Sequence, residues 1–83
     1  MSRLAKLNRR KKMLKEKQKN ITATFQVCRE AMKANLITPS QRQLIRDILR
    51  PVLHDLEGEV RDVTLHIQEE LVKRYQETCQ GKV

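Results

Sequence analysis

The chain has 83 residues, of which 18 are Lys or Arg and 10 are Asp or Glu, so its formal net charge is +8. This length allows one small domain, and a content of two Gly, two Pro, one Tyr and one Phe predicts an all-α protein rather than a sheet. No apolar run reaches the roughly 18 residues of a membrane span, and none follows the positive N-terminus as in a signal peptide, so we expect a soluble, non-secreted protein without membrane contact.

The positive charge is concentrated at the N-terminus. Residues 1–20 carry nine Lys or Arg and a single acid, Glu16, whereas residues 21–83 carry nine basic and nine acidic side chains. The sequence therefore divides into a basic arm (residues 1–20), a neutral helical scaffold (residues 21–80) and a C-terminus (residues 81–83) that we expect to fray. Such an uneven charge distribution favours polyanionic partners.

The first expected helix begins after Ser2, which is a suitable N-cap. Its apolar residues form a seam with alternating steps of three and four residues: Leu4, Leu7, Leu14, Ile21, Phe25, Cys28 and Met32. Lys11 and Gln18 interrupt this seam, so it is well formed only from Ile21 onward. We therefore expect the basic arm to continue into this helix and to be only conditionally helical. We also expect the scaffold to stay folded when residues 1–15 are deleted.

A second helix is expected to start after a turn near residues 36–38. Thr38 can cap it, Pro39 suits the first helical position, and Gln41 completes a capping box. The sequence therefore predicts a sharply defined helix start at this point.

The apolar residues of the second helix recur at eleven-residue spacing, which keeps a helix nearly straight. They are Ile45, Leu49, Val52, Leu56, Val60, Val63, Ile67 and Leu71. Because proline removes one backbone hydrogen bond and clashes with the preceding turn, we expect a single long helix that is kinked near Pro51.

Two long helices joined by a short turn form an antiparallel helical hairpin. The second helix carries further apolar residues beside its main stripe, namely Leu44, Ile48, Leu53, Leu65 and Val72. A chain this short gains core by self-association, most often as a two-fold dimer, so we predict a homodimeric four-helix bundle, with a different protein as the alternative cover. The expected oligomer or partner interface comprises Ile21, Phe25, Cys28, Met32, Leu44, Ile45, Ile48, Leu49, Leu53, Leu56, Val60, Val63, Leu65, Ile67, Leu71 and Val72.

The nine cations of the basic arm are the candidate nucleic-acid contacts: Arg3, Lys6, Arg9, Arg10, Lys11, Lys12, Lys15, Lys17 and Lys19. Most are Lys, a point charge without the planar fork that reads guanine edges, and the aromatic residues Phe25 and Tyr75 lie outside the arm. We therefore expect binding to the phosphate backbone of duplex or structured RNA, or of DNA, with weak sequence preference. A short chain that combines a helical scaffold with a basic arm fits a small regulatory or accessory protein of a virus, phage or mobile element.

The basic arm has a second interpretation. Residues 8–12, Asn-Arg-Arg-Lys-Lys, also fit a nuclear import signal if the source or host is eukaryotic. The chain would then be a protein-protein interaction module whose second helix binds a partner protein through its apolar faces.

The second helix also carries an acidic face. It consists of Asp55, Glu59, Asp62, His66, Glu69, Glu70, Lys73 and Glu77 within about 100° of the helix circumference. In a hairpin this face would lie opposite the basic arm and could dock its cations. His66 with Glu69 or Glu70 has the spacing of helical metal ligands, but the face points sideways, so we expect no metal. We also expect no cofactor and no enzyme activity, because no catalytic motif is present.

Overall fold

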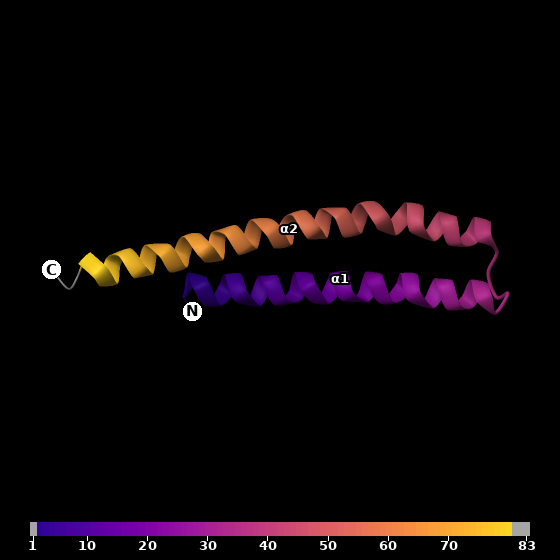
Figure 1. Ribbon diagram of the computed structural model, residues 1–83, viewed down its shortest axis with the longest axis horizontal. Coiled ribbons are helices and arrows are strands. Elements are labelled where there is room, and N and C mark those ends of the chain that lie inside the picture. The colour runs from indigo at the N-terminus through magenta and orange to yellow at the C-terminus, as the bar shows by residue number, and fades with distance from the viewer. Residues whose placement is uncertain (1, 81–83) are drawn as a thin grey trace.

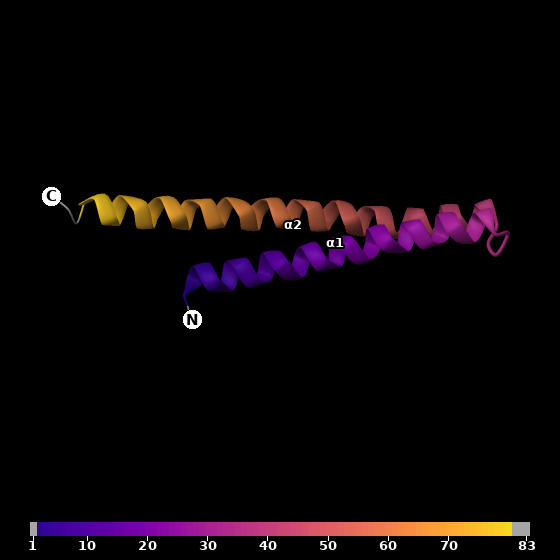
Figure 2. The ribbon, with the colours of Figure 1, turned by 60° about the horizontal axis from the view of Figure 1, so that its bottom comes forward.

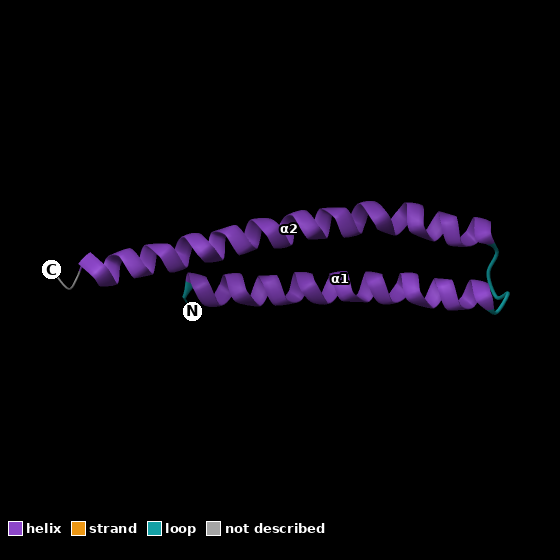
Figure 3. Ribbon diagram, viewed as in Figure 1, coloured by secondary structure: helices purple, strands orange, loops and turns teal. Residues whose placement is uncertain are grey.

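The chain folds into two long α-helices that lie side by side in opposite directions (Figure 1). The computed structural model describes residues 2–80, in which α1 spans Arg3–Lys33, α2 spans Pro39–Gln80, and residues 34–38 connect them (Figure 3). The molecule is a rod of 69 × 18 × 16 Å. The all-α hairpin predicted from the sequence is confirmed, and the predicted frayed segment, residues 81–83, lies outside the described residues.

Helix α1 begins as the sequence predicts. The Ser2 side chain accepts a hydrogen bond from the backbone N–H of Ala5 at 3.2 Å, which satisfies one of the free donors of the first turn. From Arg3 onward the basic arm is helical and continues into the rest of α1 without a break. The arm cations therefore have defined directions around one helix axis.

Helix α1 ends in a Schellman motif. Asn35 has a φ of 60°, its N–H donates to the carbonyl of Met32 at 3.1 Å, and the N–H of Leu36 donates to the carbonyl of Ala31 at 2.8 Å. Asparagine tolerates this left-handed conformation better than most residues. The connection therefore begins at residue 34, two residues before the turn predicted near residues 36–38.

The start of α2 is the predicted capping box. The backbone N–H of Gln41 donates to the Thr38 hydroxyl at 3.1 Å, and the backbone N–H of Thr38 donates to Gln41 Oε1 at 2.9 Å. Two donors without helical partners are thus satisfied reciprocally. Pro39 occupies the first helical position, where its missing N–H costs nothing.

Helix α2 continues through Pro51 to Gln80. Figure 1 shows a gentle bow along the length of α2. Continuity of the predicted long second helix is therefore observed, and a kink at Pro51 is not confirmed. The C-terminal end of α2 extends past the N-terminal end of α1 (Figure 1).

The core lies between the helices and is centred on the basic arm. Leu14, Leu56 and Val63 form the buried cluster, with only 3% of Leu14 exposed. The partly buried residues that pack against this cluster are Leu7, Ile21, Val60 and Ile67. Leu7 and Leu14 belong to the basic arm, so the arm contributes side chains to the core of the hairpin. Folding of the scaffold without residues 1–15 stays a prediction.

The two helices cross at a shallow angle (Figure 2). The remaining buried residue in the described part of the chain is Cys28, on the half of α1 that leads into the connection. No side chain of the described residues is completely enclosed. A two-helix hairpin thus buries one narrow stripe and leaves both flanks of each helix open.

Candidate nucleic-acid interface

The nine predicted phosphate contacts all project from α1, between Arg3 and Lys19. Eight of them are exposed and Lys11 is half-buried. None forms an ion pair within the described residues, where the ion pair observed joins Lys33 Nζ to Glu30 Oε1 at 3.7 Å. The positive ends of these side chains are therefore available to a ligand.

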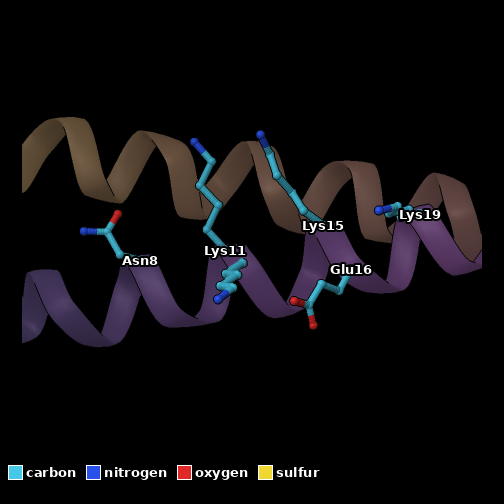
Figure 4. A pocket seen from close by; sticks show the side chains of 6 residues that line it. Asn8, Lys11, Lys15, Glu16 and Lys19 are labelled. Atoms are coloured by element: carbon cyan, nitrogen blue, oxygen red, sulfur yellow. The ribbon is translucent and has the colours of Figure 1, made fainter.

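One side of α1 gathers lysines around a shallow hollow of about 360 Å³. We call this side the lysine face and define it as Lys11, Lys12, Lys15 and Lys19; Asn8 and Glu16 complete the lining. Figure 4 shows Lys11 and Lys15 pointing to the same side of the helix and Glu16 pointing away from them. The one acid of the arm therefore does not reach into the space above Lys11 and Lys15.

The opposite side of α1 meets the acidic face of α2. Arg10 lines a hollow of about 220 Å³ together with Glu59, Asp62 and His66. Arg3 and Lys17 lie seven residues, or about two turns, from Arg10 and so share its side of the helix. The acids of α2 offset part of the positive potential on this side, although the predicted docking is not made through ion pairs among the described residues.

The predicted interface residues separate into two groups. Three are buried within the hairpin (Cys28, Leu56 and Val63), and eight are half-buried: Ile21, Phe25, Met32, Ile45, Leu49, Leu53, Val60 and Ile67. Those left exposed are Leu44, Ile48, Leu65, Leu71 and Val72. The seam of α1 is therefore used within the chain, and the predicted interface residues that stay exposed all lie on α2. Met13 and Val27 of α1, which were not predicted, are exposed as well.

Sequence reasoning missed a second cationic cluster. Arg29 of α1 and Arg42, Arg46 and Arg50 of α2 line one pocket between the helices. The four-residue spacing of the α2 arginines is visible in the sequence, but residues 21–83 sum to zero charge and that balance concealed it. Arg42, Arg46 and Arg50 precede the acidic face along α2, so a net charge of zero over residues 21–83 does not make the surface uniformly neutral.

The acidic face does not assemble a metal site. No group of three or more His, Cys, Asp or Glu side chains converges among the described residues. The carboxylates of this face are exposed apart from Glu70, which is half-buried. What the face contributes is negative potential beside Arg10.

Comparison with known proteins gives no match. No protein-family model, curated protein sequence or solved structure is significantly similar to this chain. Over the described residues, neither helix contains a stretch apolar and long enough to cross a bilayer.

Proposed function

We propose that this chain is a small nucleic-acid-binding accessory or regulatory protein that grips the phosphate backbone through the basic arm. The observation that supports this most directly is the lysine face, where four lysines line one side of a regular helix and none forms an ion pair with a described residue. Exposed cations without partners are poised to replace the counterions of a polyanion.

The residue types favour contact with phosphates over reading of bases. The lysine face contains no arginine and no aromatic residue, so it offers point charges without guanidinium forks or stacking surfaces. An interface that uses six to eight cations should give a log-log slope of affinity against salt of about −5 to −7 on duplex DNA. Binding should therefore be steep in salt and nearly independent of base sequence.

A second copy of the chain is the cover we propose for the exposed apolar residues of α2. Leu44, Ile48 and Val52 recur every fourth residue and remain 61%, 60% and 45% exposed. Packing these stripes together would build the four-helix bundle that a chain this short needs for a larger core. Dimerisation would also double the phosphate contacts available to one nucleic acid.

Titration of labelled nucleic acids with the full chain tests the proposal. DNA duplex, RNA duplex and single strands of unrelated sequences should each be followed by fluorescence anisotropy between about 50 and 200 mM salt. We expect micromolar or tighter binding at low salt that weakens steeply as salt rises, with small differences between sequences. Absence of salt-sensitive binding to all of these probes would contradict the proposal.

A second candidate function is supported by the exposed apolar residues of α2. In that case Leu44, Ile48, Leu65 and Val72 bind a different protein, and residues 8–12 act as a nuclear import signal. Light scattering over a range of protein concentrations separates the candidates. A dimer supports the first, whereas a monomer that binds no nucleic acid supports the second.

A further inference from the structure

A pocket in the half of the hairpin nearest the connection brings four arginines together. Its volume is about 300 Å³, and its lining combines Arg29, Arg42, Arg46 and Arg50 with three apolar or weakly polar side chains, Phe25, Cys28 and Leu53. No carboxylate belongs to the lining. We call this the arginine pocket.

The two helices position these guanidinium groups from opposite sides. Arg42, Arg46 and Arg50 follow one another at four-residue steps along one side of α2, and Arg29 reaches the pocket from α1. Arg42 Nη1 also donates to Met32 Sδ at 3.7 Å, a contact that crosses from α2 to α1. The pocket is therefore a feature of the folded hairpin and not of either helix alone.

The arrangement is costly unless an anion occupies it. None of the four arginines forms an ion pair within the described residues, and like charges four residues apart on a helix repel each other. Arg42 and Arg46 are in addition half-buried. A phosphate group suits such a site, because guanidinium forks bind phosphate oxygens through paired, charge-assisted hydrogen bonds.

The pocket lies on the same side of the hairpin as part of the lysine face. Lys11 and Arg29 are eighteen residues apart on α1, which is five full turns, so their side chains leave the helix in the same direction about 27 Å apart. Successive phosphates of one DNA strand are spaced about 3.4 Å along the axis. On a duplex aligned with this side, the two clusters would therefore lie roughly eight base pairs apart along the axis.

We propose that the arginine pocket is a second phosphate-binding site, which holds a backbone phosphate of the same nucleic acid that contacts the lysine face. This inference rests on the proposed function and adds an anchor to it. The apolar floor at Phe25 and Leu53 would lie against the sugar or base attached to that phosphate. The site would make the contact with nucleic acid longer than the basic arm itself.

Replacing one pocket arginine in the full chain tests the inference. Arg46→Gln should weaken binding to a duplex of two turns roughly fivefold to tenfold and reduce the salt slope by about one unit. Arg46→Lys should keep the slope but lose part of the affinity, because it retains the charge and loses the fork. Lys73→Gln removes one charge from the acidic face of α2 and should change affinity less than Arg46→Gln.

A stability measurement separates binding from a structural role. If the pocket exists to bind phosphate, Arg46→Gln should leave the thermal midpoint of the free chain unchanged or slightly raised, because repulsion is relieved. If the wild-type chain binds and Arg46→Gln and Lys73→Gln bind with equal affinity, the arginine pocket is not a phosphate-binding site. That result would leave the proposed function unaffected. Failure of the wild-type chain to bind any probe would overturn the proposed function, and the pocket assignment with it.

Discussion

The two halves of the hairpin differ in how charge and packing are combined. The distal half, residues 3–21 with residues 56–77, contains the buried cluster of Leu14, Leu56 and Val63 and also the lysine face. The turn half, residues 22–55, contains one buried residue, Cys28, and the arginine pocket. The most basic segment is thus the better packed one, which shows that a run of charged residues can also contribute to the core.

Alanine substitution of single leucines tests the difference in packing between the two halves, and it should have the largest effect on the free energy of unfolding. Leu14→Ala removes the most buried leucine of the distal half and should lower the free energy of unfolding by about 2 to 5 kcal/mol, measured by urea denaturation with circular dichroism. Leu49→Ala, at a half-buried position of the turn half, should cost less, and Leu44→Ala, at a position 61% exposed, should change stability by about 0.5 kcal/mol or less. A smaller loss for Leu14→Ala than for Leu49→Ala would reverse the comparison.

The capping box tests the turn half alone. Thr38→Ala removes the hydroxyl that accepts from the Gln41 N–H and should cost about 1 kcal/mol of unfolding free energy. Thr38→Ser keeps an acceptor and serves as the matched control. Equal stability of the two variants would mean that this end of α2 frays in solution and that the turn half is even less stable than its packing indicates.

Substitution of Gly58 should have the smallest effect on stability, and it should raise stability where the other substitutions lower it. A Cβ atom added at this position would meet no other atom within 4 Å, and the glycine has no positive φ. Gly58→Ala should therefore raise the thermal midpoint, with a gain of about 0.5 to 1 kcal/mol from helix propensity and reduced freedom of the unfolded chain. A loss of stability would indicate that another chain approaches α2 closely here.

The sequence predicted the helices well because its boundary signals are local. Ser2, Thr38 and Gln41 cap through atoms three residues away, and those contacts need no knowledge of the fold. Asn35 was missed as the end of α1, since asparagine adopts the left-handed conformation less regularly than glycine.

The packing of the basic arm was less predictable. Lys11 and Gln18 interrupt the apolar seam in the arm, yet both are half-buried and Leu14 between them is buried. A lysine can lay its methylene groups along apolar surface while its ammonium group stays in water. Counting apolar residues in one helix therefore underestimates a core that is largely completed by the other helix, here by Leu56 and Val63.

The candidate site was predicted in part for a similar reason. The positive charge of the basic arm can be counted directly in the sequence, and its nine cations lie exposed or half-buried on α1. The division of these cations between the lysine face and the side near Glu59 and Asp62 depends on how the two helices pack. The arginine pocket depends on the same packing, because Arg29 and Arg46 come from different helices.

A comparison of two triple variants with equal net charge tests the central claim most directly. One variant, Lys12→Gln/Lys15→Gln/Lys19→Gln, neutralises most of the lysine face, and the other, Arg3→Gln/Lys6→Gln/Lys17→Gln, neutralises cations elsewhere on the arm. On a DNA duplex at about 100 mM salt, the first should lose affinity on the order of a hundredfold and reduce the salt slope by roughly 2 to 3 units. The second should lose less than about tenfold. Equal losses in the two variants would show that the arm acts only through its net charge and would contradict a defined lysine face.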